Sequence, residues 1–418
     1  MLKRIKRTIL SLAITAGLVF ALFGGREGYQ KLMETKENVN DVLKQAEELV
    51  KQYDYEDAVR MLEDAEKQLH LKEIKEAIES YKEEQESLRP VDVTDIPHIF
   101  FHSLIIDTER AFDDDEDSAG YNQYMTTEAE FREILTQLYN NGYVLVSPHD
   151  AYVETEEGFV PGEILLPRGK RPLIISQDDV NYYDYMTGDG FASRLVLDQD
   201  GHVQAEYTDA EGNVLVGAYD LVPILDEFIS ENPDFSYKGA RAVLAVTGYE
   251  GVFGYHNVID PKSAAYAEEC RTVSEIADAL RAEGYELASH TYGHIQCGTV
   301  SAEALYADTE AWETQIGALI GGSDILIYPY GEDISSNVAF DCYEASERFN
   351  ILYEAGFRYY MNVDSTHTAW VQLCNRYVRN ARRNIDGFRM RYFSKSMKDL
   401  FYDFDAVYDW SRPPVDRL

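Results

Sequence analysis

The sequence predicts an α/β domain built on a parallel sheet or barrel, preceded by a helical segment and an apolar N-terminal run. Beyond about residue 90, short β-rich runs alternate with helical stretches, which is the pattern of strands joined by crossover helices. Residues 26–88 instead carry apolar residues at helical spacing and contain no proline. With 418 residues, 45% of them hydrophobic, the chain can form one large domain and an accessory region.

The N-terminal run predicts a signal-anchor over residues 1–25. Four cations in "MLKRIKR" precede "TILSLAITAGLVFALFGG", which is about as long as the roughly 20 apolar residues that cross a bilayer. The cations should stay in the cytoplasm, so we expect a single-pass protein of the cell membrane with its main domain extracellular. Cleavage as a signal peptide and secretion is the alternative. The length of the run and the poor small-x-small exit at "ALFGG" favour the retained anchor.

Residues 26–90 predict an antiparallel helical hairpin followed by a third helix. The segment "AEELVKQYDYEDAVRMLEDAEK" resembles a tetratricopeptide half-repeat, although a stable array needs several units. We therefore expect a stalk that holds the main domain away from the membrane, with the binding of a protein partner as the alternative. The apolar stripes are Val39, Val42, Leu43, Ala46, Leu49 and Val50, then Ala58, Val59, Leu62, Ala65 and Leu69, then Ile74, Ile78 and Tyr81.

Two prolines in "RPVDVTDIP" end the helical pattern and predict a main domain over residues 91–400, with a C-terminal tail over 401–418. A helix is expected in "TTEAEFREILTQLYNNG", from a Thr127/Glu130 capping box to a stop at Gly142. Residues 186–220 alternate around DG and EGN turns, which predicts an inserted β-meander. The strand candidates are "HIFFHSLII", "YVLVS", "RPLIIS", "RAVLAVTG", "YELAS", "ILIYP" and "FRYYMNV".

Composition excludes some classes of partner. The formal charge of −37 argues against nucleic acid, because phosphate binding depends on clustered Lys and Arg. The four cysteines have no CxxC spacing, so neither a zinc ribbon nor a redox motif is expected, and their pairing stays open.

Polar residues follow four of the predicted strands, where side chains of a parallel α/β fold converge. Two imidazoles in an i, i+4 relation can reach one cation, and a carboxylate from another strand end completes three protein ligands with an open position. A His-x3-His pair alone also arises by chance in a chain with nine histidines. The clusters are Asp178 and Asp179, His290 and His294, Pro329 to Asp333, and Asp364 with His367.

The chain order of "SQDDV", "SHTYGH" and "YPYG" resembles the polysaccharide deacetylases, the NodB-homology family of carbohydrate esterases (family 4). The resemblance covers about residues 96–395 and is strongest at "GYELASHTYGH". It implies a deformed (β/α) barrel, a divalent metal that is most often zinc, and removal of N-acetyl groups from aminosugar polymers such as peptidoglycan or an exopolysaccharide.

By position, the resemblance implies that Asp179, His290 and His294 bind the metal and that Asp178 is the general base. It also implies that the turn of Pro329 and Tyr330 offers the Tyr330 N–H to the oxyanion. Bound zinc would lower the pKa of its water toward about 7, which suits this division of roles.

The general acid is less defined. His367, beside Asp364, is the candidate, because histidine can donate a proton near neutral pH. His102, at the end of "IFFHS", is expected near the site on the barrel floor, with a hydrogen-bonded core histidine as the alternative.

The chain departs from the family pattern at three positions. Gln177 and Val180 replace an aromatic residue and a glycine, and Ile327 stands where an arginine normally orients the catalytic aspartate. A later loop, "RYVRNARRNIDGF", could supply that cation from Arg379, Arg382 or Arg383, with a surface role as the alternative. The missing arginine supports an alternative function, a catalytically weak relative that binds glycan or a partner. A separate alternative is a metal-dependent hydrolase of another substrate, a small amide or an O-acetyl ester.

Overall fold

The computed structural model describes residues 26–335, 343 and 346–416, and the predicted anchor at residues 1–25 lies outside them. Within the described residues, no helix combines the length and the apolar character needed to cross a bilayer. The chain divides into two compact units between Leu88 and Arg89, and each unit is described separately below.

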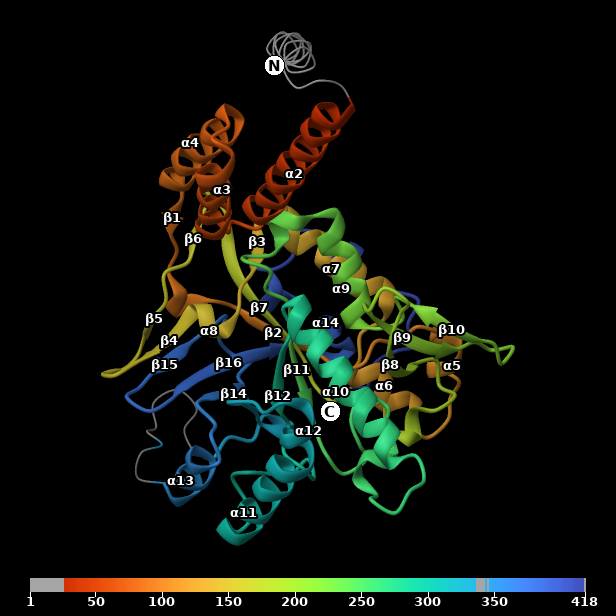
Figure 1. Cartoon of the computed structure of the whole chain (residues 1–418). Helices are drawn as coiled ribbons and strands as arrows, with labels where there is room; N and C mark the ends of the chain where they lie inside the picture. The colour runs from red at the N-terminus through yellow and green to blue at the C-terminus, as the bar shows by residue number, and fades with distance from the viewer. Residues whose placement is uncertain (1–25, 336–342, 344–345, 417–418) are drawn as a thin grey trace. The chain divides into compact units, whose positions relative to one another are not determined.

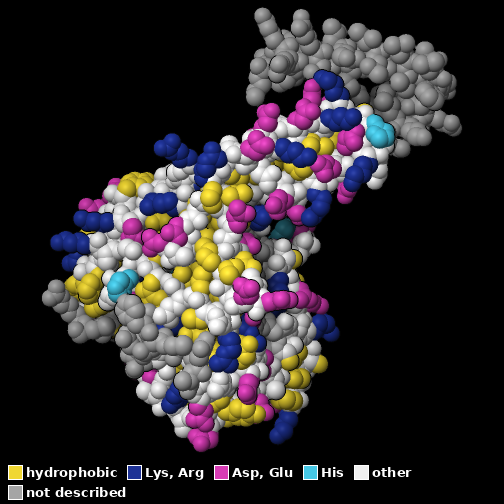
Figure 2. Space-filling view, turned by 90° about the vertical axis from the view of Figure 1, so that its left-hand side faces the viewer, with side chains coloured by type: hydrophobic (Ala, Val, Ile, Leu, Met, Phe, Trp, Pro, Cys, Tyr) yellow, Lys and Arg dark blue, Asp and Glu magenta, His cyan; other side chains and the backbone are white. Residues whose placement is uncertain are grey.

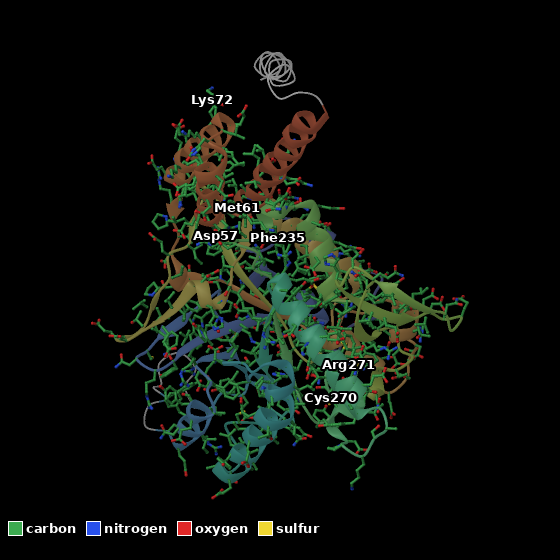
Figure 3. The ribbon with its side chains drawn as sticks, in the orientation of Figure 1. Asp57, Met61, Lys72, Phe235, Cys270 and Arg271 are labelled. Atoms are coloured by element: carbon green, nitrogen blue, oxygen red, sulfur yellow. The ribbon has the colours of Figure 1, made fainter. Side chains whose placement is uncertain are left out.

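The first unit is helical. It contains α2 (Arg26–Lys51), α3 (Tyr55–Leu69) and α4 (Lys72–Ser87). Asp54 caps α3 by accepting the Asp57 N–H, which satisfies one of the unpaired donors of the first turn. Ala46, Ala58, Leu62 and Ile74 are fully buried, so small and branched side chains meet where the helices pack. Figure 3 labels Asp57 on α3 and Lys72 at the start of α4.

The second unit contains a closed parallel barrel, which confirms the predicted fold class. Each strand of the ring pairs in parallel with the next, and β11 pairs with both β12 and β7, which closes it. Figure 1 shows strands from distant parts of the chain side by side, such as the orange β2 and the blue β16. The ring is β2 (His98–Phe101), β7 (Arg171–Gln177), β11 (Val243–Val246), β12 (Glu286–Ser289), β13 (Ile325–Ile327), β14 (Tyr359–Val363) and β16 (Val378–Asn384).

Strand β16 corrects the expectation of a basic loop after residue 376. The segment "VRNARRN" lies between β14 and β2, with β15 (Val371–Leu373) antiparallel to it. Arg379 and Arg382 are fully buried there, and each pairs with a carboxylate. Buried charge of this kind hides the apolar pattern by which a core strand is normally found.

Helices surround the barrel. The capping box of Thr127 and Glu130 starts α7 (Glu128–Asn140), as predicted. The other helices near the ring are α9 (Leu221–Glu231), α10 (Tyr266–Glu283), α11 (Ala302–Ala311) and α13 (Glu347–Glu354). Phe235, labelled in Figure 3, packs edge-to-face on Tyr139 and Phe228 at 6.1 and 5.3 Å between ring centroids. These contacts anchor α7 and α9 to one core.

Shorter elements precede, connect or follow the strands of the ring. They are β1 (Arg89–Pro90), β3 (Tyr143–Leu145), β4 (Tyr152–Thr155), β5 (Gly158–Pro161), β6 (Leu165–Leu166), α5 (Thr108–Ala111), α6 (Ser118–Tyr124), α8 (Pro148–Ala151), α12 (Ala318–Ile320), α14 (Gly387–Phe393) and α15 (Phe404–Val407). The predicted meander is present as β8 (Ala192–Leu197), β9 (Val203–Thr208) and β10 (Val214–Gly217), all antiparallel.

The segment expected as a C-terminal tail packs on the barrel domain. Arg412 is buried and places Nη1 2.6 Å from Oε2 of Glu130, the buried capping-box residue of α7. Figure 2 shows Lys and Arg interspersed with Asp and Glu over the face it displays. The acidic excess of the chain is therefore mixed with positive charge on this face.

Candidate active site

The predicted site residues converge at the carboxyl end of the barrel. A cavity of about 600 Å³ opens there, and part of its lining comes from residues that directly follow β2, β7, β12 and β13. Parallel strands place such residues at one edge, so local sequence motifs become a common site. The lining includes His102, Asp178, Asp179, His290, His294 and Tyr330.

Asp179, His290 and His294 can hold one cation. Their ligand atoms all lie within 4.8 Å of one another, and the Nε2 of His294 is 3.9 Å from Oδ2 of Asp179. Asp179, His294 and Tyr330 all adopt left-handed backbone conformations, with φ of 58°, 51° and 58°. Non-glycine residues rarely adopt this conformation, because it is strained. Three such residues at one site indicate that the positions of their side chains are maintained at a cost in local backbone stability.

The backbone fixes the tautomer of His290. Its Nδ1–H donates to the carbonyl of Ile327 at 2.8 Å, which leaves the Nε2 lone pair directed away from that bond. Burial lowers the pKa of His294, and the nearby Asp179 only partly opposes this shift. The His294 ring therefore favours the neutral form that a metal requires. Ile327, which replaces the expected arginine, thus contributes its carbonyl to the site.

A tyrosine holds Asp179 in place. The Tyr183 hydroxyl donates to Oδ1 of Asp179 at 2.6 Å and lies 2.9 Å from Oγ1 of Thr247 at the end of β11. One oxygen of Asp179 is therefore fixed, while the other lies toward His294. The sequence motifs did not identify Tyr183, which is four residues past Asp179.

The cation beside Asp178 comes from β16. Arg382 donates from Nη1 and Nη2 to the two carboxylate oxygens of Asp178 at 2.6 and 2.9 Å, and both side chains are buried. Burial raises the pKa of Asp178, but Arg382 and then His290 lower it to about 2. Asp178 is thus ionised near neutral pH and rigidly oriented by a bidentate pair.

Buried polar groups position Arg382 in turn. Its Nη1 also donates to Oγ of Ser176 at 3.1 Å, and that oxygen is 2.9 Å from Nε2 of His98. Burial, followed by the charge of Arg382, lowers the pKa of His98, so its imidazole is neutral. The Nδ1 of His98 accepts from the Asn380 amide at 3.1 Å. This chain ties three ring strands, β2, β7 and β16, to the orientation of Asp178.

His102 lines the cavity, whereas His367 does not. The Nδ1–H of His102 donates to the carbonyl of Tyr124 at 3.1 Å, which frees Nε2. Asp386, buried at the end of β16, also lines the cavity. Burial raises the pKa of its carboxyl group, and the hydrogen bond from the Arg389 N–H and the nearby His102 oppose that shift only in part. His367 is exposed after β14 and lies 2.8 Å from Asp364.

The remaining predicted residues have distinct positions. Pro329 is buried in the turn that carries Tyr330, whose own side chain is exposed and contacts the His294 ring at 4.5 Å between centroids. Arg379 pairs with Asp333 at 2.8 Å, a buried carboxylate that also accepts from the Tyr343 hydroxyl. Arg379 is therefore not the partner of Asp178.

The chain matches no protein-family model and no curated protein. Among solved structures, it is similar to the Streptococcus pyogenes deacetylase PplD in complex with acetate, at 13% identity over 72% of this chain and 94% of that chain, with a TM-score of 0.38. It is also similar to the chitin deacetylase from the fungal pathogen Colletotrichum lindemuthianum, at 14% identity over 44% of this chain and 74% of that chain, with a TM-score of 0.19.

Proposed function

We propose that the barrel domain is a metal-dependent polysaccharide deacetylase of the NodB-homology type, which hydrolyses N-acetyl groups of an aminosugar polymer. The observation that carries the proposal is the convergence of Asp179, His290 and His294 with the paired carboxylate Asp178 in one cavity. Three ligand side chains beside an ionised base form the arrangement that hydrolytic metal sites use.

The donor set fits a divalent cation, most often zinc. Two imidazoles and one carboxylate form a ligand set that zinc accepts and that leaves a fourth position open, and the Ile327 carbonyl presets the His290 tautomer. When bound, such an ion would polarise the amide carbonyl and lower the pKa of a coordinated water toward about 7.

The chain's own groups then divide the proton transfers. Asp178 accepts a proton from the attacking water, and Arg382 keeps the carboxylate aimed into the cavity. The N–H of Tyr330 stabilises the oxyanion that forms on the carbonyl. His102 donates the proton that the leaving amine requires, since its Nε2 is free and it lines the cavity, and it replaces His367 in this role.

Arg382 bears on the alternative functions. The argument for a catalytically weak relative depended on Ile327, and Arg382 supplies the missing cation from another strand. Hydrolysis of an O-acetyl ester or a small amide remains the competing reaction for the same groups.

The sequence also supports a cellular location for this activity. The cations and the apolar run of residues 1–25 would tether the enzyme to the cell membrane, with its cavity extracellular and facing cell-wall or secreted glycan. The helical unit would act as a stalk or bind a protein partner. Fractionation of cells that express the full-length protein, followed by protease accessibility of intact cells, tests both the anchor and its orientation.

The central experiment is acetate release from N-acetylglucosamine oligomers by the full-length protein, with and without a chelator. We expect the His290→Ala and Asp178→Asn variants to lose at least about 10²-fold in kcat/KM. The exposed Asp200→Asn variant is the matched control and should retain wild-type activity. Wild-type activity that equals both site variants, with no stoichiometric divalent ion, would exclude the proposal. Release from O-acetyl esters alone would assign the esterase reaction.

A further inference from the structure

Tyrosines line one part of the cavity that also contains the candidate metal ligands, and this part is called the arm below. Tyr121 and Tyr124 of α6 line it from one side, and Tyr183 and Tyr185 line it from the segment that follows Asp179. The Tyr185 ring stacks on Tyr121 at 6.3 Å and 12°, and on Tyr183 at 5.8 Å and 16°. Its side chain is nonetheless 51% exposed. The arm thus presents ordered, nearly parallel aromatic faces to solvent.

The stack is rigid and continuous with the reaction centre. Tyr183 also stacks on Tyr249 at 5.3 Å, and the hydroxyl of Tyr183 donates to Asp179 at 2.6 Å. The Tyr121 hydroxyl donates to Asp189 at 2.8 Å. Tyr121 and Tyr183 are each fixed by ring stacking and by a hydrogen bond of the hydroxyl group. The stack therefore loses little conformational entropy when a flat apolar ligand face packs on it. A ring bound on Tyr185 would therefore lie next to a group held at Asp179.

The arm also carries an uncompensated negative charge. Asp117, the N-cap residue of α6, lines it, and no Lys or Arg forms an ion pair with Asp117 within the described part of the chain. Burial is the main cause that raises the pKa values of Tyr185 and Tyr121, and Asp117 adds to both shifts. The Asp117 side chain therefore lines the same cavity as the two rings that would hold the ligand.

We propose that this arm binds the sugar next to the reacting one, and that Asp117 selects a neighbour whose amino group is already free and cationic. An N-acetylated neighbour would stack on Tyr185 equally well but would offer no charge to Asp117. The preferred substrate is then a partly de-N-acetylated chain, so each deacetylation would favour the next on the same polymer. This inference rests on the proposed function and adds the substrate class of the same cavity.

A pair of matched dimers tests the selectivity. The full-length protein is assayed on di-N-acetylated dimers and on the two dimers that keep one acetyl group and have one free amine. We expect kcat/KM to be about fivefold higher for one of the mixed dimers at low salt, which is the effect of one partly exposed ion pair. Asp117→Asn should reduce this ratio to about one, whereas the control Asp200→Asn should keep it. Equal kcat/KM values for all dimers in the wild type would overturn the inference.

The stacking contribution is tested separately. Tyr185→Leu should raise KM about tenfold more for the dimers than for the monomer N-acetylglucosamine, because the lost aromatic contact contributes about 1.4 kcal/mol only when a neighbouring sugar is present. An equal loss on monomer and dimers would place Tyr185 in the general stability of the cavity and contradict a neighbouring-sugar subsite.

Binding without turnover separates this inference from the proposed function. A glucosamine trimer carries no acetyl group, and its affinity for the full-length protein can be measured by calorimetry. We expect binding that weakens with salt, and that is weaker by about fivefold in Asp117→Asn and by about tenfold in Tyr185→Leu. Trimer binding without acetate release from any substrate would refute the proposed reaction alone. Acetate release without trimer binding, and with no preference among dimers, would refute the subsite alone.

Discussion

At the amino ends of β12 and β13, Glu286 and Asp324 bind His149 through both ring nitrogens, at 2.9 and 3.1 Å. At the carboxyl ends of the same strands, His290 keeps one nitrogen on a backbone carbonyl, and His294 has no hydrogen-bond partner of its ring nitrogens among the described residues. One end of the barrel satisfies its imidazole, and the other leaves imidazole lone pairs available. Strand geometry is shared, so the difference lies in the side chains that surround each ring.

The contrast separates stability from function within one scaffold. Burial lowers the pKa of His149, but the hydrogen bonds that its ring N–H groups donate to Asp324 and Glu286 outweigh burial and raise the pKa to about 10, so His149 acts as a structural cation. The lowered pKa of His294 has the opposite cause, since burial outweighs its carboxylate neighbour. A neutral imidazole such as that of His294, whose ring nitrogens make no hydrogen bond among the described residues, is costly without a ligand, which indicates that the carboxyl end is built to bind one.

Removal of Arg382 should give the largest effect. Arg382→Met leaves the Asp178 carboxylate buried without its partner, and we expect a loss of about 3–5 kcal/mol in the free energy of unfolding. The double variant Arg382→Met/Asp178→Asn should recover part of that loss, because the buried charge is gone. Chemical denaturation of the three proteins measures both values. A cost below about 1 kcal/mol for Arg382→Met would show that the pair is not buried in solution.

Metal binding should stabilise the folded protein through the ligands at the carboxyl end of the barrel and not through His149 at the amino end. A ligand at 100 times its dissociation constant adds about 2.7 kcal/mol to the folded state. Zinc should therefore raise the melting temperature of the wild type and of His149→Gln, but not that of His290→Ala or Asp179→Asn. An equal rise in all four proteins would mean that zinc binds elsewhere and would remove the distinction between the two ends.

The choice of general acid is a narrower test of the carboxyl end. His102→Gln should lower kcat by about 10²-fold with little change in KM, because proton donation to the leaving amine is lost. His367→Gln should stay within about twofold, since His367 is exposed outside the cavity. The dependence of kcat on pH should change shape only in His102→Gln. The reverse pattern would restore His367 as the acid.

The sequence predicted those parts of the site that are local in the chain. Asp178 and Asp179 are adjacent, and His290 and His294 are one turn apart, so a short motif at the end of a strand contains their geometry. The hydrogen bond from Arg382 to Asp178 joins residues 204 positions apart. No local pattern encodes such a contact, and the sequence offered three neighbouring arginines as equivalent candidates.

The missing strand has a physical explanation. β16 contains three arginines in seven residues, and burial of charge contradicts the apolar runs expected of a barrel strand. The alternation of strands and helices along the chain contained a useful signal. A parallel barrel needs one more strand after β14 before the ring can close on β2. The position of His102 directly after a strand placed it near the site. Its role as proton donor depended on which loops surround the cavity, and no local motif contains that information.

The smallest effect separates the two ends by pH. The folded pKa of His149 lies above its ordinary value of 6.5, so its contribution to stability is complete below about pH 6.5 and is lost as the pH rises through about 10. Partial exposure limits that contribution to about 1 kcal/mol. Unfolding free energies measured from pH 6 to 10 should decline less in His149→Gln than in the wild type. The pKa of Asp178 is lowered to about 2 beside Arg382, so titration of this carboxylate does not account for the wild-type decline over this range. A wild-type decline that His149→Gln reproduces in full would assign the titration to another group and leave the amino end without its structural cation.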